Sequence, residues 1–362
     1  YKELVMNLRE HYGGEAICGL LRLFFYRGMN FMAKPFQTHN QQLKMLRKRN
    51  IIITNGSKAK AILIRENYYQ LINGYKHIFL DSAESKKRQD DYYKNGTTFE
   101  QIYALYEFDR NLRNILIKYI LMTENSIKSK IAYQFSSEHP KEAFSYFNIN
   151  NYRDTNHQQT TSLIAALSSV TKQNTDSVTK SGPFYHYFNE HKELPLWVLI
   201  TKLTLGQTCN LFYNLKEPTQ IEILKSVLYE FKNNCNVAAT KITLQNYLKD
   251  FMSAINCIKA FRNVCAHEDR LYDYYAKNKN GKPIQTSFFY IGITTPAFQG
   301  GIFDIILLLR LFLTKRDYKQ LLRRLFDELN NLETELPSSL FSEVTRKMKL
   351  PKNWKNELNK FI

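Results

Sequence analysis

The chain is 362 residues long and 44% hydrophobic, with 24 Phe and 24 Tyr, a composition that excludes a disordered protein and predicts a packed fold. Its 51 Lys and Arg against 33 Asp and Glu give a formal charge of +18, which favours a polyanionic partner, nucleic acid above all. General solubility charge is the alternative explanation of that excess.

The cysteines and the apolar segments indicate the compartment. The five cysteines are scattered and contain no C-x-x-C pair, so we expect free thiols in a reducing cytoplasm. The most apolar stretch, 302–313, is about half as long as the roughly 20 residues that cross a bilayer, and it contains Asp304 and Arg310. We expect no membrane span.

Residues 1–97 are predicted to form an N-terminal helical region. Apolar residues recur at spacings of three and four between 36 and 78, which predicts two short helices that close on Asn73-Gly74-Tyr75, with Gly74 at a helix C-terminus. The polar stretch 82–97 predicts a linker or an exposed loop.

Residues 98–335 are predicted to form a helical core, followed by a C-terminal helical tail at 336–362. The apolar period between 99 and 135 predicts one long helix, or two with a kink. Residues 150–182, rich in Asn, Thr, Ser and Gln, are predicted to be an insertion or a mobile loop. Further helices are predicted at 194–215, 218–231, 244–267, 302–313 and 317–333. The sequence therefore predicts an all-α protein with irregular insertions.

The segment FRNVCAHEDR, 261–270, places Arg262, Asn263 and His267 at the end of a predicted helix. Asn263 and His267 are four residues apart and share a helix face, and the long Arg262 side chain can reach the same side. These groups suit metal-independent RNA cleavage, in which histidine takes the proton of a ribose 2′-OH and arginine stabilises charge on the phosphate. Such a reaction spares DNA and leaves 2′,3′-cyclic phosphate and 5′-OH ends.

Two other interpretations of the segment stay open. Arg262 can pair with a carboxylate of Glu268-Asp269 while His267 only ends the helix, which is a structural role. A metal site on Cys257, Cys265 and His267 is disfavoured because this spacing matches no compact zinc arrangement. We expect neither a metal nor another cofactor.

Six segments together carry a family resemblance: KPFQTHNQQLKMLRKRNI, ENYYQLINGYKHIF, YEFDRNLRNILIKYILMTENSIKSKIAYQF, ELPLWVLITKLTLGQTCNLFYNL, FRNVCAHEDRLYDY and MKLPKNW. They resemble the abortive-infection proteins of the D/F type, the Abi_2 family, from about residue 34 to the C-terminus. The resemblance implies a HEPN-type helical bundle and an endoribonuclease of phage defence. Arg262 and His267 would be its catalytic pair, with Asn263 supporting them.

The resemblance also implies partners. HEPN nucleases usually combine two such motifs across a pseudo-twofold interface, which implies a homodimer, and the family's F branch is associated with a structured non-coding RNA. A toxin-antitoxin-like system with a small regulatory RNA is therefore expected. Glu268-Asp269 departs from the common family form and opposes the approach of phosphate, so a catalytically silent protein that holds such an RNA is the alternative. A protein-interaction scaffold is a third hypothesis.

Further residues are assigned to RNA binding or to packing. Candidate RNA contacts are Arg110, Arg113, Lys259 and Arg270, although a salt-bridged face is the alternative for Arg110, Arg113 and Glu124 on the long helix. Trp197 and Gly206 are predicted to be a core filler and a close helix contact. Tyr68, Tyr69 and Tyr75 can stack on bases or form a buried aromatic cluster.

Overall fold

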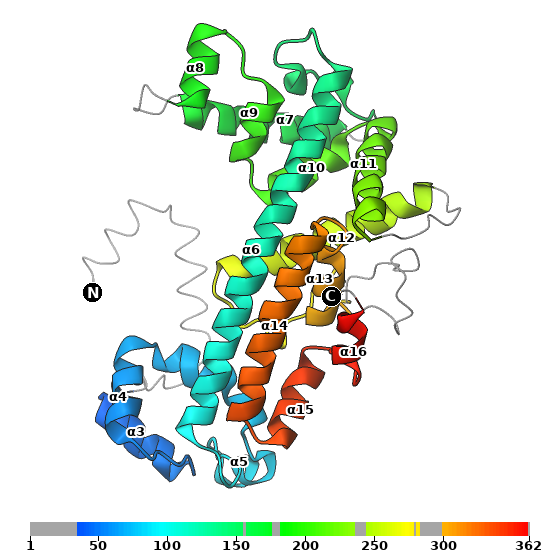
Figure 1. Cartoon of the computed structure of the whole chain (residues 1–362). Helices are drawn as coiled ribbons and strands as arrows, with labels where there is room; N and C mark the ends of the chain where they lie inside the picture. Colours follow the sequence, from blue (N-terminus) through cyan, green and yellow to red (C-terminus); the bar gives the residue numbers. More distant parts are fainter. Residues whose placement is uncertain are drawn as a thin grey trace, which may run out of the picture.

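The computed structural model describes residues 35–154, 157–175, 182–235, 244–278, 280–282 and 299–360 (Figure 1). These residues form helices joined by turns, and this part of the chain has no β-strand beyond isolated bridges such as Ile52 with Thr98. The all-α prediction is confirmed. Within the same ranges, none of the helices combines the length and the apolar character needed to cross a membrane.

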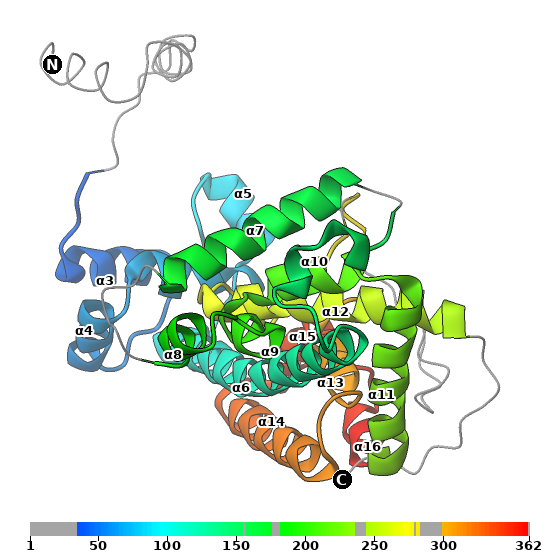
Figure 2. The same cartoon turned by 90° about the horizontal axis from the view of Figure 1, so that it is seen from above.

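The long helix α6 (Phe99–Glu138) runs through the molecule from the N-terminal helices to the green helices at its other end (Figure 1). Thr98 and Gln101 form a capping box at its start, with both hydrogen bonds 3.1 Å long. Side chains on several faces of α6 are buried because α9, α11, α12 and α14 pack on it from different sides (Figure 2). One uninterrupted helix therefore positions the rest of the fold.

The N-terminal region packs near the start of α6. It contains α3 (His39–Lys48), α4 (Gly56–Arg65), a π-helical turn η1 (Tyr69–Asn73), a 3-10 turn η2 (Lys76–Ile78) and α5 (Ser82–Arg88). Gly74 is the C-cap of η1, as expected, but it has φ −65° and ψ −36° instead of a left-handed conformation, and the chain stays helical through Tyr75. The expected loop at 82–97 is also partly wrong, because Asp81 caps α5 by accepting from Ala83 and Glu84 N–H.

The region beyond the C-terminus of α6 is more helical than predicted. It contains α7 (His157–Thr175), α8 (Pro183–Glu190), α9 (Leu196–Leu199), a 3-10 turn η5 (Ile200–Lys202), α10 (Leu205–Asn214) and α11 (Glu217–Cys235). The loop expected at 150–182 is wrong over α7, where Leu163, Leu167 and Val170 are buried at helical spacing and the helix packs against α10. The single helix expected at 194–215 is broken before Thr204, which starts α10 with a capping box to Gln207.

The C-terminal helices complete the core. They are α12 (Leu244–Ala266), α13 (Ile302–Leu309), α14 (Lys315–Glu335), α15 (Ser338–Lys347) and α16 (Trp354–Asn359). In Figures 1 and 2, α14 lies along α6, while α12 crosses behind it. Asn111 of α6 hydrogen-bonds Glu328 of α14 at 3.1 Å, which fixes the register of the two helices.

Two packing predictions were wrong. Trp197 is 52% exposed and fills no core position. The short helix α9 packs on α6, and its buried residues are Leu196, Val198 and Leu199. A Cβ added at Gly206 would meet only the Thr204 hydroxyl, at 3.8 Å, so no neighbouring helix approaches closely there.

Asp304 is a buried carboxylate in the first turn of α13. Its Oδ2 accepts hydrogen bonds from the backbone N–H of Gly301 at 2.9 Å and of Gln299 at 3.1 Å. Burial nevertheless raises the pKa of this carboxyl from 3.8 to about 6. The folded chain thus binds the proton more tightly than the unfolded chain, so the free energy of unfolding increases as the pH falls through about 6.

The Asp304→Asn variant should lack this part of the pH dependence. Between pH 6 and pH 5 the wild type should gain about 1 kcal/mol relative to the variant, as urea unfolding at the two pH values would measure. Asp327→Asn, which changes an exposed carboxylate on α14, is the control and should follow the wild type. Parallel curves for wild type and Asp304→Asn would contradict the prediction.

Candidate functional site

The site lies where α12 ends. Glu268 takes the left-handed conformation, with φ of 57°, and the Asp269 N–H donates back to the Val264 carbonyl at 3.1 Å. This six-to-one hydrogen bond is that of a Schellman motif, which stops a helix sharply. His267 is consequently the last residue before the turn, and its own N–H still donates to the Asn263 carbonyl at 3.0 Å.

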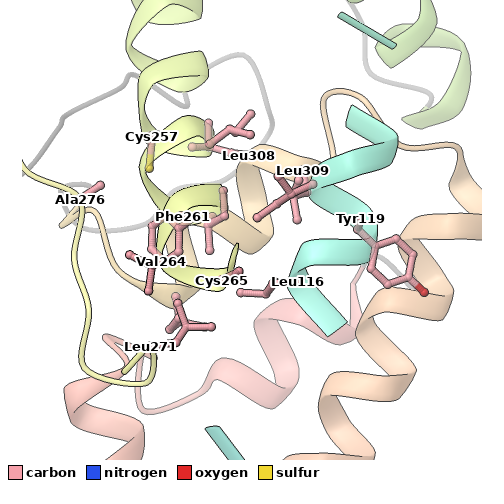
Figure 3. Close-up of a cluster of buried hydrophobic side chains, with 14 of the residues drawn as sticks. Leu116, Tyr119, Cys257, Phe261, Val264, Cys265, Leu271, Ala276, Leu308 and Leu309 are labelled. Atoms are coloured by element: carbon pink, nitrogen blue, oxygen red, sulfur yellow. The ribbon is translucent and has the colours of Figure 1, made fainter. Parts of the chain in front are cut away.

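The apolar members of the same segment hold this helix end in the core. Figure 3 shows Phe261, Val264 and Cys265 in a cluster of buried side chains that includes Leu116 of α6 and Leu271 beyond the turn. Because these residues face inwards, the helix presents Asn263 and His267 to solvent, four residues apart on one face.

Arg262 lies between the buried and exposed faces, with 29% of its side chain exposed. The carboxylate near it is neither Glu268 nor Asp269 but Glu124 of α6, whose Oε2 is 3.9 Å from Arg262 Nε. The other Glu124 oxygen, Oε1, pairs with Lys128 at 2.7 Å, and both side chains of that pair are nearly buried. The buried acid therefore stands between a lysine and the motif arginine.

The contact between Arg262 and Glu124 is incomplete. Neither Arg262 Nε nor Glu124 Oε2 has a hydrogen-bond partner in the described part of the chain, although both atoms are buried. Buried polar atoms normally find such partners. The guanidinium is held near a carboxylate without being neutralised by a close pair, so it remains able to bind an anion.

The other basic residues that were predicted to contact RNA differ in their burial and in their ion pairs. Lys259 lies one turn before Arg262 on α12, is half-buried, and forms no ion pair within the described ranges. Arg110 pairs with Glu66 at 3.1 Å, and Arg270 pairs with Asp273 at 2.7 Å.

Arg113 is only 5% exposed and pairs with Asp109, inside the protein, where an RNA phosphate does not reach it. The salt-bridged arrangement considered for the long helix thus describes Arg110, Arg113 and Glu124. Asp109 and Lys128 were not identified from the sequence as partners in these ion pairs. Asp109 is four residues before Arg113, and Lys128 is four residues after Glu124, a spacing that indicates ion pairs on a helix.

The three tyrosines separate. Tyr75 is 3% exposed and donates to Asp109 at 2.6 Å, Tyr68 is half-buried, and Tyr69 is 72% exposed. Only Tyr69 is free to stack on a base.

A metal site on this segment does not assemble in the described residues. Cys257 and Cys265 are buried in the core, whereas His267 is exposed, and no group of three His, Cys, Asp or Glu side chains in the described ranges could hold a metal ion. Burial raises the pKa of the Cys265 thiol to about 12, so it is a poor ligand and nucleophile at neutral pH.

Two cavities of the described residues lie away from the helix end. One, of about 970 Å³, is lined by N-terminal residues including Arg49, Tyr69 and Lys76. The other, of about 360 Å³, lies between α4, α6 and α14. Neither is lined by residues of α12.

Comparison with known proteins identifies a family for the chain. A family model described as Abi-like protein, Abi_2, matches residues 61–273, which is more than half of the chain and includes α6, the helix end and the turn after it. The search of curated proteins and the search of solved structures found no match.

Proposed function

Because the chain belongs to the Abi-like protein family, which points to abortive-infection defence against phage, we propose that it is a metal-independent endoribonuclease of the HEPN type. The observation that carries the proposal is the end of α12, which presents His267 and Asn263 to solvent beside an arginine that no close ion pair neutralises. The charge of +18 favours RNA as the partner of this surface.

The proposed reaction begins with proton transfer. His267 takes the proton of a ribose 2′-OH, and the oxygen attacks the adjacent phosphorus. The bond from phosphorus to the 5′-oxygen breaks, leaving a 2′,3′-cyclic phosphate on one fragment and a 5′-OH on the other. Arg262 stabilises the charge that grows on the phosphoryl oxygens, and Asn263, one turn before His267, orients the imidazole.

A single chain supplies only half of this chemistry. The departing 5′-oxygen needs a proton while the 2′-OH loses one, so a second acid-base group speeds the reaction, and His267 is the one histidine of the motif. In a twofold dimer, His267 of the partner subunit would face the same phosphate and supply that group. The exposure of Asn263 and His267 at the helix end supports this arrangement, because a partner subunit can reach them. A small non-coding RNA would restrain or guide the dimer in the cytoplasm.

The test is an incubation of purified protein with RNA in the presence of EDTA. We expect fragments with 2′,3′-cyclic phosphate ends, detected by mass spectrometry, and no cleavage of DNA of the same sequence, because DNA lacks the attacking hydroxyl. Light scattering of the active fraction should give twice the mass of the 42.8 kDa chain. An active monomer, cleavage of DNA, or activity that EDTA abolishes would contradict the proposal.

The second candidate function is that of a silent RNA holder. Glu268 and Asp269 are both exposed directly after His267, where they oppose a phosphate group. If this function is the right one, the protein should copurify with a discrete intact RNA and bind RNA in a salt-sensitive way without cutting it.

A further inference from the structure

Asp109 of α6 is a fully buried carboxylate that collects hydrogen bonds from distant parts of the chain. It is 0% exposed, and its oxygens accept from the Tyr75 hydroxyl at 2.6 Å and from the Arg113 guanidinium. They also accept from the backbone N–H of Leu271 at 3.1 Å and of Tyr272 at 2.6 Å. A carboxylate with four donors in the interior is a strong fixed point, because removing any donor leaves buried charge poorly compensated.

Two of these donors belong to the segment that follows the functional turn. Leu271 and Tyr272 come four and five residues after His267, and the Schellman turn lies between them and the helix end. Arg113 extends the same support, since its Nη1 donates to the Asp269 carbonyl at 3.3 Å. The turn is therefore fixed on one side by α12 and on the other by α6.

The N-terminal segment also contacts this part of the chain, through residues 74 and 75. Arg270 of the turn donates to the Gly74 carbonyl, and the ring of Tyr75 stacks on that of Tyr272 with centroids 6.1 Å apart and an interplanar angle of 22°. Gly74 thus contacts Arg270 of the turn, and Tyr75 contacts both Asp109 and Tyr272. Movement of this segment would remove its contacts with Arg270 and Tyr272 together with the hydrogen bond to Asp109.

We propose that Asp109 is a positioning residue for His267, and that Tyr75 makes this positioning depend on the N-terminal segment. Asp109 touches no substrate in this scheme; it fixes the turn, and the turn fixes the direction in which the imidazole leaves the helix end. The catalytic part of the inference rests on the proposed ribonuclease function, whereas the structural part does not. A rate that depends on a nucleophile and an acid-base group within hydrogen-bonding reach is sensitive to such displacement.

The chain offers a matched pair of variants. Tyr75→Phe removes a hydroxyl that donates to Asp109 at 2.6 Å. Tyr106→Phe removes a hydroxyl that donates to another carboxylate, Glu66, at 2.9 Å. The two rings are edge to face with centroids 5.4 Å apart, and both are at most 9% exposed, so the substitutions cost similar packing. Only Tyr75 is connected to the turn.

Hydrogen exchange of the Leu271 and Tyr272 amides is the first measurement, and it needs no activity. Tyr75→Phe should speed their exchange about tenfold, since one hydrogen bond to a charged group is lost, while Tyr106→Phe should leave it unchanged. Asp109→Asn should speed it further. If Tyr75→Phe exchanges like Tyr106→Phe at these amides, the positioning role is refuted, whether or not Asp109→Asn folds.

The second measurement is RNA cleavage by the same proteins. Tyr75→Phe should lower kcat about fivefold to tenfold with KM unchanged, and Tyr106→Phe should keep both constants, because neither hydroxyl contacts RNA. Equal kcat values for the two variants would refute the coupling to the site. If even the wild type leaves RNA intact, the ribonuclease proposal fails, and the exchange of the two amides alone decides whether Asp109 fixes the turn.

Discussion

His267→Ala should lower the rate of RNA cleavage by about 10³-fold, which lies within the range that positioned proton-transfer groups contribute. The loss is large because a dimer with this substitution lacks the imidazole of both copies, and thus both the base for the 2′-OH and the acid for the 5′-oxygen. The fold should be retained, since His267 is exposed and the backbone hydrogen bond that it donates to Asn263 does not need the ring.

His157→Ala is the matched control, because His157 is an exposed histidine at the start of α7, away from the motif. It should cleave RNA like the wild type. Thermal unfolding of both variants would show that any difference in rate does not come from loss of structure. Cleavage by His267→Ala at the wild-type rate would remove the catalytic role of His267. Binding of RNA without cleavage, by the wild type and by both variants equally, would instead support the RNA holder.

The helices that could be predicted are those in which apolar residues recur at spacings of three and four without interruption. The 40 residues of α6 and the 23 residues of α12 show this spacing, and both helices were expected nearly to their ends. The helix α7 was missed because its composition is polar, although a few apolar residues at helical spacing are enough to bury one face against α10. The break before α10 was also readable, since Thr204 and Gln207 have the spacing of a capping box.

The candidate site also has a part that the sequence predicts and a part that it does not. The position of Asn263 and His267 on one face follows from their spacing on a helix, and the sequence predicts it. The neighbours that the site acquires from α6 do not follow, because Glu124 lies 138 residues before Arg262, and Asp109 lies 162 residues before Leu271. Such pairs depend on the angle and position at which two helices cross. The spacing of residues along the sequence does not reveal that geometry.

Arg262→Ala should lower the cleavage rate about 10²-fold, the effect expected when one donor to a developing oxyanion is lost. The rate is the sensitive quantity, and the free energy of unfolding should change little, because Glu124 keeps its ion pair with Lys128 at 2.7 Å. Arg262→Lys should recover part of the rate, since the charge remains but the planar fork that grips two phosphate oxygens does not. The measurement is single-turnover cleavage of one labelled RNA.

Arg323→Ala is the control for Arg262→Ala, because it removes an exposed arginine of α14 and changes the net charge equally. If long-range attraction were all that Arg262 supplied, the two variants would lose the same small part of the rate, and the loss would disappear at high salt. A local role at the phosphate predicts that only Arg262→Ala is slow, at every salt concentration. In cells, the Arg262→Ala chain should then be tolerated better than wild type or Arg323→Ala, because the proposed function attributes growth arrest to RNA cleavage.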